Sequence, residues 1–243
     1  MKLTVLGCGD AFGNGGRNNT SFLFTEDNKH ILLDCGATTL VRLKHEKINL
    51  EDISTIVISH FHGDHFGGLP FFFISSMFEK PRRGHLSIVG PKGLKGRVFE
   101  LQEAMYKGTT EKLQDLDISF HEYTQGLPLT IDDLIIQAWE VDHSLQSIPH
   151  GIRLEWRGKH IGFSGDTSWV ENLVPLSDNT DLFICECNFL DKVSFGHLSY
   201  EELFGKSKLL NAKQLWISHM ANEVIDATYV ELNKLSDGQK IIF

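Results

Sequence analysis

The sequence predicts a mixed α/β fold in which buried strands alternate with helices. Short runs rich in Val, Ile, Leu and Phe recur along the chain, and several of the segments between them carry apolar residues three and four apart. Runs that are almost continuously apolar are typical of strands covered on both faces. With 243 residues, 41% of them hydrophobic, the chain is long enough for a sizeable core. We therefore expect one domain over residues 1–243, built from two similar halves at about 1–120 and 121–243.

The apolar runs place the strands in chain order, at residues 3–6, 21–24, 31–33, 53–58, 86–89, 118–121, 134–139, 151–156, 159–163, 181–186, 214–218 and 240–243. Helical spacing predicts helices at 38–47, 70–78, 94–106, 199–210 and 223–235. Polar turns at 26–29 and 157–158 join neighbouring strands into hairpins. Pro70 fits the first turn of its helix, and Ser199 with Glu202 forms a capping box.

The charge balance argues against a general nucleic-acid binder. The net charge is −9 at pH 7, whereas such proteins carry a basic excess. One stretch departs from this balance, because residues 80–97 carry only basic charges, at Lys80, Arg82, Arg83, Lys92, Lys95 and Arg97. A solvated surface and a rim that faces phosphate groups are both compatible with this stretch.

Composition also indicates where the protein resides. No apolar run approaches the roughly 20 residues that a membrane span needs, and the N-terminus lacks the apolar segment of a signal peptide. The cysteines show neither a disulfide framework nor zinc-ribbon spacing; they are Cys8, Cys35, Cys185 and Cys187. We expect a cytoplasmic protein that makes no membrane contact.

A long loop rich in glycine and asparagine, residues 7–20, follows the first strand. The third glycine of a dinucleotide-binding fingerprint is absent at position 12, and nothing helix-forming follows, so we expect no Rossmann site. The loop either lets backbone approach a ligand closely or is a chain of turns.

The strongest functional signal is the segment 59–68, Ser-His-Phe-His-Gly-Asp-His-Phe-Gly-Gly. It carries four potential metal ligands directly after an apolar strand: His60, His62, Asp64 and His65. Residues two apart in an extended segment point the same way, so the first two can reach one ion while the last two reach a second. The alternative is a set of core histidines beside a solvated aspartate. It would need buried polar partners that the local sequence does not offer.

Other acids and histidines follow further apolar runs, where each strand should end. They are Asp34, Asp166, Glu186 and His219, and His60 is placed in the same way. Ligand sites in open α/β sheets gather at the carboxyl ends of strands, so we expect one shared cavity. His143 also follows a strand, although a lone histidine there is more often structural. Nitrogen and oxygen donors without thiolate suit zinc, with manganese and iron as alternatives.

The pattern His60-x-His62-x-Asp64-His65 resembles the signature of the metallo-β-lactamase superfamily, which consists mostly of hydrolases. The turn Gly90-Pro91-Lys92-Gly93-Leu94 is similar to one in the ribonuclease Z branch of that superfamily. The resemblance covers essentially the whole chain. It implies a four-layer αββα sandwich, whereas periodicity alone indicates only a mixed α/β fold.

The same resemblance implies a site for two divalent metal ions. One ion would be bound by His60, His62 and His143, the other by Asp64, His65 and His219, and both by Asp166. A bridging ligand must be an acid, because a carboxylate has an oxygen for each ion. Asp34 would hydrogen-bond a metal-binding histidine. Glu186 and His197 match a proton-donating pair of the ribonuclease Z branch. Without the resemblance, they are more simply a capping-loop histidine beside a salt-bridged glutamate.

Two such ions can lower the pKa of a shared water from about 15.7 towards about 7, which predicts hydrolysis. We expect the substrate to be a phosphodiester: Asp64 would orient the nucleophile, and His197, polarised by Glu186, would protonate the departing alkoxide. One alternative is a carbonyl hydrolase acting on a lactone, thioester or β-lactam. Another is a metal-stabilised binding scaffold without turnover.

The segment between His143 and Asp166 limits the size of the substrate. A predicted hairpin nearly fills residues 144–165, so the long tRNA-gripping arm that ribonuclease Z enzymes carry there has no room. Together with the negative charge, this favours a small or nucleotide-like phosphodiester, such as a cyclic nucleotide or an RNA-end phosphate, over long RNA. Homodimers are common in the resembled branch, although the sequence shows no interface signal.

Overall fold

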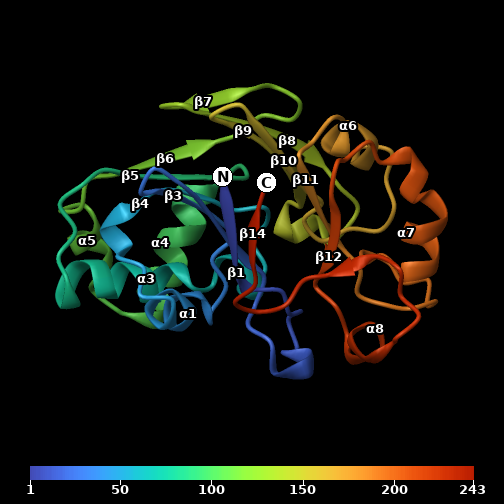
Figure 1. Ribbon diagram of the computed structural model, residues 1–243. Coiled ribbons are helices and arrows are strands. Elements are labelled where there is room, and N and C mark those ends of the chain that lie inside the picture. Colours follow the sequence, from blue (N-terminus) through green and yellow to red (C-terminus); the bar gives the residue numbers. More distant parts are fainter.

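The computed structural model describes residues 1–243 and is built on two β-sheets of seven strands each (Figure 1). The strand order of the first sheet is β14-β1-β2-β3-β4-β5-β6. These strands are β1 (Lys2–Gly7), β2 (Ser21–Glu26), β3 (Lys29–Leu33), β4 (Ile53–Val57), β5 (Leu86–Gly90), β6 (Ile118–Glu122) and β14 (Lys240–Ile242). Strands β3 to β6 run parallel, so their carboxyl ends share one edge of the sheet.

The second sheet has the order β13-β12-β11-β10-β9-β8-β7. Its strands are β7 (Leu129–Ile131), β8 (Leu134–Glu140), β9 (His150–Trp156), β10 (Lys159–Phe163), β11 (Leu182–Glu186), β12 (Leu215–Ser218) and β13 (Asn233–Lys234). Strands β10 to β13 are parallel, whereas β7 to β10 form an antiparallel meander. The short edge strand β7 was missed by the sequence prediction, because three residues carry too little pattern to be recognised.

Helices cover the outer face of each sheet (Figure 1). Beside the first sheet lie α1 (Thr39–His45), α2 (Gly63–Phe66), α3 (Leu69–Ile74), α4 (Leu94–Met105) and α5 (Thr110–Leu113). Beside the second lie α6 (Leu173–Ser177), α7 (Tyr200–Lys206) and α8 (Asn222–Asp226). Shorter turns of helix are η1 (Asn14–Gly16), η2 (Leu50–Asp52), η3 (Ser75–Glu79, of π type), η4 (Leu145–Ser147) and η5 (Ser207–Leu209).

The buried apolar side chains form three layers, which define the sandwich. The middle layer joins the inner faces of both sheets, for example through an edge-to-face contact between Phe22 and Phe163 with ring centroids 5.5 Å apart. The two outer layers lie between each sheet and its helices. Alternate residues of one strand serve two layers: Ile184 of β11 points inward, and Phe183 points towards the helices. This confirms the four-layer αββα prediction and explains why the strands are apolar throughout.

The predicted helix over 223–235 is wrong for most of its length. Helix α8 ends at Asp226, and Ala227 has extended backbone angles. The Nζ atom of Lys234 donates to the carbonyl oxygens of Ile225 and Ala227. In a longer helix these two oxygens would instead accept hydrogen bonds from backbone N–H groups. The following residues reach β13, which pairs with β12. Sheet pairing thus overrides the helical spacing.

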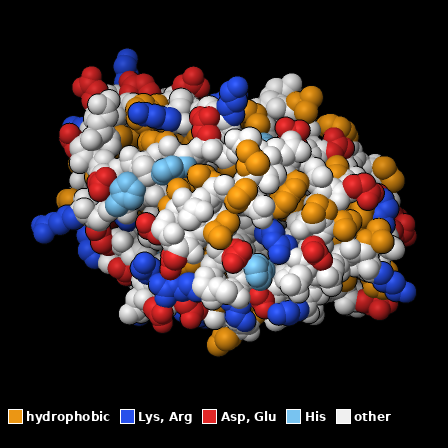
Figure 2. All heavy atoms as spheres, turned by 90° about the horizontal axis from the view of Figure 1, so that it is seen from above, with side chains coloured by type: hydrophobic (Ala, Val, Ile, Leu, Met, Phe, Trp, Pro, Cys, Tyr) orange, Lys and Arg blue, Asp and Glu red, His pale blue; other side chains and the backbone are white.

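The surface at the top of Figure 1 shows acidic and basic side chains interspersed, with no field of one sign across that face (Figure 2). None of the helices has the length and apolarity that a bilayer span requires.

Within the basic stretch 80–97, Arg82 has a structural role. Its side chain is buried, and its guanidinium donates to four backbone carbonyl oxygens, those of Leu50, Ile53, Gly84 and His85, at 2.6–2.9 Å. These bonds fix the loop that leads from η3 into β5 against the start of β4. The guanidinium of Arg82 is therefore bonded within the protein and is not available to bind a phosphate group.

Replacing Arg82 by alanine should lower the free energy of unfolding by about 3 kcal/mol or more, because four carbonyl groups lose their donor in a buried place. Urea unfolding followed by circular dichroism measures this change. The neighbouring Arg83 is exposed, so Arg83→Ala is the matched control and should change stability by less than about 0.5 kcal/mol. Equal effects of the two substitutions would contradict the role given to Arg82.

Candidate metal centre

Acids and histidines predicted to follow strands do meet at one end of the sandwich. Asp34 follows β3, His60 follows β4 and Asp166 follows β10, while Glu186 ends β11 and His219 follows β12. All five side chains are buried. Asp34 and His219 have left-handed backbone angles, with φ of 58° and 56°. This conformation is costly for residues with a Cβ atom, and such strain is concentrated at functional sites.

A first group of donor atoms comes from His60, His62, His143 and Asp166, whose ligand atoms all lie within 4.8 Å of one another. The Oδ2 atom of Asp166 lies 3.7 Å from His60 Nε2 and 3.9 Å from His143 Nε2. Unlike His60 and His143, which face the group with Nε2, His62 faces it with Nδ1, which lies 3.0 Å from His143 Nε2. His62 sits at the N-terminal cap of α2 in extended conformation, where the chain turns from β4 into the helix.

A second group shares Asp166 and adds Asp64, His65 and His219. The Nε2 atoms of both histidines lie 3.3 Å from Asp64 Oδ2, and they lie 3.3 and 3.2 Å from Asp166 Oδ2. Asp64 and His65 are consecutive residues of α2, so one short helix provides two of the four donors. The structure thus brings together all seven side chains that the sequence singled out for metal binding.

The electrostatics of this centre favour positive charge. Burial alone would raise the pKa of Asp166, but His219 and His65 hold it well below its usual value, so the carboxylate is ionised. Burial alone would lower the pKa of His219, yet Asp166 and Asp64 raise it to about 9. By contrast, burial lowers the pKa of His143 to about 4, which keeps that imidazole neutral, as a metal ligand must be.

Three buried polar atoms at this point have no hydrogen-bond partner in the protein: His60 Nε2, His65 Nε2 and Asp166 Oδ1. Leaving such atoms unpaired costs free energy, so buried groups of this kind have protein, water or metal partners in most folded proteins. The three atoms belong to the two donor groups. The arrangement therefore fits metal ions, with nitrogen and oxygen donors and no thiolate.

Hydrogen bonds on the outer side of the imidazoles fix which nitrogen faces the centre. His65 Nδ1 donates to Asp34 Oδ2 at 2.7 Å, and Ser59 donates to both oxygens of Asp34 through its backbone N and its Oγ, each at 2.7 Å. His60 Nδ1 donates to Ser59 Oγ at 3.0 Å. The Nε2 lone pairs of both histidines therefore point inward. Asp34 has the histidine contact expected of it.

Two residues on the other side of the centre were missed by the sequence prediction. The carbonyl oxygen of Gly196 accepts from His143 Nδ1 at 2.8 Å, and φ of Gly196 is +81°. A Cβ atom at this position would lie 2.6 Å from His143 Nδ1, so glycine is required there. The side-chain amide of Asn188 donates to the carbonyl oxygen of His219 at 2.9 Å and lies 3.3 Å from its Nδ1. The only sequence signal for either residue is its closeness to His197 or Glu186.

Glu186 and His197 form a pair beside the second donor group. His197 Nδ1 lies 3.0 Å from Glu186 Oε1, and the His197 ring is stacked on that of His219 with centroids 5.4 Å apart. The backbone N–H groups of Thr167 and Leu198 donate to Glu186 and hold it in place. Burial alone would lower the pKa of His197, but the Glu186 carboxylate raises it. His197 is 23% exposed, so its outer nitrogen can reach a ligand.

The 7–20 loop is a chain of turns that packs on itself. A Cβ atom on Gly7 would lie 2.0 Å from the carbonyl oxygen of Asn19, so this glycine permits close approach within the loop. The carboxylate of Asp237 accepts from the backbone N–H groups of Cys8 and Asn18, at 3.1 and 2.7 Å. These bonds tie the loop to the segment that leads into β14.

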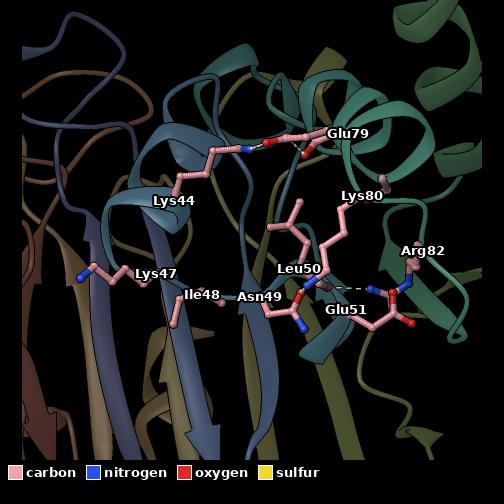
Figure 3. Close-up of a pocket in the computed structure, with 11 residues that line it drawn as sticks. Lys44, Lys47, Ile48, Asn49, Leu50, Glu51, Glu79, Lys80 and Arg82 are labelled. Atoms are coloured by element: carbon pink, nitrogen blue, oxygen red, sulfur yellow. Dashed lines mark hydrogen bonds and ion pairs between the residues drawn. The ribbon is translucent and has the colours of Figure 1, made fainter.

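A separate cavity of about 320 Å³ lies at the start of β4, at the other end of that strand from His60 (Figure 3). Three of the four cationic side chains that line it, those of Lys44, Lys80 and Arg82, are bonded within the protein. Lys44 is paired with Glu79, and Lys80 Nζ donates to Asn49 Oδ1 at 2.8 Å. The cavity offers no cluster of nucleophilic or metal-binding groups and does not belong to the centre.

Comparisons with known proteins agree with this geometry. Ribonuclease Z from Clostridium acetobutylicum is 26% identical, over 91% of this chain and 88% of its own. The probable metallo-hydrolase YhfI from Bacillus subtilis is 26% identical, over 90% and 87% of the two chains. The crystal structure of YhfI, described as a metallo-β-lactamase fold protein, superposes over 99% of both chains with a TM-score of 0.77 and 23% identity.

The crystal structure of human tRNase Z, short form, superposes with a TM-score of 0.80 and 23% identity over 100% of this chain and 99% of the other. These likenesses confirm the resemblance to the ribonuclease Z branch of the metallo-β-lactamase superfamily. A more specific match comes from the family model of the anti-Pycsar protein Apyc1, which covers residues 1–235. The chain therefore belongs to the anti-Pycsar protein Apyc1 family.

Proposed function

We propose that the protein is a metal-dependent phosphodiesterase with two divalent ions. The observation that carries this proposal is the position of Asp166 Oδ2, which lies within 3.9 Å of imidazole nitrogens from both donor groups. A single carboxylate shared in this way is what a two-metal hydrolytic site requires. The curated relatives named ribonuclease Z support a phosphodiester substrate over the carbonyl alternative.

The two donor groups support the division of the ligands that the sequence suggested. His60, His62 and His143 would hold one ion, Asp64, His65 and His219 the other, and Asp166 both. We propose zinc, because the donors are imidazole nitrogens and carboxylate oxygens around small, buried positions. When bound, the ions would supply an activated water and neutralise the oxygens of the phosphate.

Side chains of the protein would carry out the remaining steps of the reaction. Asp64 faces the histidines with one oxygen, Oδ2, and we propose that it orients the attacking water. His197, kept protonated by Glu186, would donate a proton to the departing alkoxide. Glu186 is fully buried, and its carboxylate accepts hydrogen bonds from two backbone N–H groups and contacts His197. Its proposed role is therefore to orient and polarise that imidazole.

The structure supports a small substrate. Residues between His143 and Asp166 are used by η4, β9, β10 and their connections, so no arm extends from this segment. We propose a small or nucleotide-like phosphodiester, such as a cyclic nucleotide, rather than long RNA. A cytoplasmic location is part of this proposal, because all four cysteines are free and buried.

Asp166→Asn should remove at least one metal equivalent, because a neutral amide is a much weaker ligand than the carboxylate that faces both donor groups. Hydrolysis of bis(p-nitrophenyl) phosphate should fall roughly 100-fold or more. Elemental analysis after reconstitution with zinc measures the metal content. Asp178 is exposed and bonds only to Asn211 through its side chain, so Asp178→Asn serves as the control. Two equivalents retained in Asp166→Asn would overturn the bridging role.

His197→Ala should slow hydrolysis of a cyclic nucleotide roughly 100-fold or more, since its alkoxide leaving group needs an acid. Bis(p-nitrophenyl) phosphate has a much better leaving group and should lose far less. Steady-state rates of the zinc-reconstituted enzyme on these two substrates and a thioester test this. Exposed His85 provides the control, His85→Ala. A wild-type enzyme that hydrolyses only the thioester, or a variant equally slow on both phosphates, contradicts the assignment.

A further inference from the structure

The cavity of about 320 Å³ at the start of β4 lies between two segments of the chain, 44–51 and 75–82 (Figure 3). Lys44 reaches in from the last turn of α1, and Lys80, the residue that follows η3, reaches in from the opposite wall. The volume lies at the lower end of the range of about 300–1,000 Å³ that is usual for small-molecule sites. The cavity therefore has room for a compact ligand, at the other end of β4 from the metal centre.

The side chains that line this cavity carry more positive than negative charge. Four of them are cationic and two are acidic: Lys44, Lys47, Lys80 and Arg82, against Glu51 and Glu79. The whole chain, by contrast, has a net charge of −9. A hollow lined by an excess of one sign raises the local concentration of the opposite charge. An anion is therefore attracted to this cavity although the protein as a whole is acidic.

The lysines retain hydrogen-bond donors that the protein does not use. An ammonium group has three N–H donors. Lys80 Nζ makes a single hydrogen bond, to Asn49 Oδ1 at 2.8 Å, and the exposed Lys47 makes no ion pair. Lys44 is held by an ion pair with Glu79 in which both side chains are exposed, so the pair is weak and an anionic ligand can compete for it. All three lysines can therefore donate to a bound anion.

The walls of the cavity also contain features that are costly without a ligand. Lys47 has left-handed backbone angles, with φ of 58°, and η3 is a π-helical turn. Both features are concentrated at functional sites. Ser76 of η3 lines the cavity, and its buried Oγ has no hydrogen-bond partner in the protein. A buried hydroxyl normally has a partner, and the cavity is where a ligand can supply one.

We infer that this cavity binds a small phosphate monoester. Ammonium groups recognise phosphate oxygens as point charges, without the fixed fork that a guanidinium needs. A monoester carries about two negative charges at pH 7, which matches several lysines better than the single charge of a diester. The site is separate from the metal centre, so the inference does not depend on the proposed function. A phosphate monoester is also the class of product that phosphodiester hydrolysis releases, and the cavity separates the two classes by charge.

Isothermal titration calorimetry of the full-length, zinc-reconstituted protein with glycerol 3-phosphate tests this inference. The double variant Lys44→Ala/Lys80→Ala should weaken binding at the cavity roughly 10-fold or more, because two charged donors are lost. Both side chains are exposed, so the variant should fold. Lys47→Glu should weaken the same site in the same direction. The rate on bis(p-nitrophenyl) phosphate should stay within about twofold in both variants, which separates this site from monoester binding at the metal centre.

Lys92→Ala is the matched control, because Lys92 is an exposed lysine of the same basic stretch that does not line the cavity. It should bind glycerol 3-phosphate as the wild-type protein does. Dimethyl phosphate, a monoanion, should bind the cavity roughly 5-fold more weakly or worse. The inference is overturned by a wild-type protein that binds no monoester, by lysine variants that bind as many monoester molecules per chain with unchanged affinity, or by equal binding of the diester at the cavity.

Discussion

The buried carboxylate of Asp166 imposes the strongest constraint on this structure. Its Oδ2 atom faces imidazole nitrogens that come from both sheets: His60 and His65 follow a strand of the first, and His143 and His219 follow strands of the second. A charged oxygen so far from water is unfavourable unless positive charge faces it. The two sheets must therefore hold their carboxyl ends at a fixed distance from one another, and the middle apolar layer does this.

The site is rigid because its donors are supported from behind. Asp34 and Ser59 hold His65 and His60 from the side of the first sheet, and Gly196 holds His143 from the side of the second. Each support fixes a ring nitrogen, so the orientation of the donors does not depend on the ions alone. These hydrogen bonds therefore fix the tautomer of each of the three imidazoles.

The donors themselves could be predicted from sequence because histidine and aspartate after apolar strands are chemically distinctive. The pattern from His60 to His65 fixed their type, and the strand ends fixed their common location. Gly196 could not be found in this way, because it acts through a backbone oxygen that any residue possesses. Asn188 was equally hidden, since its role depends on which distant elements pack together. Helical spacing at 223–235 failed because pairing with β12 was invisible locally.

The strand β14 completes the first sheet by pairing with β1, and the carbonyl oxygen of Phe243 accepts a hydrogen bond from the amino group of Met1. During synthesis, one edge of β1 therefore stays open until residues 240–242 have left the ribosome. An unpaired strand edge is prone to associate with other chains, so the nascent protein is vulnerable to aggregation until that point. A chain truncated before residue 240 would keep that vulnerability permanently, even though every metal-binding side chain would be present.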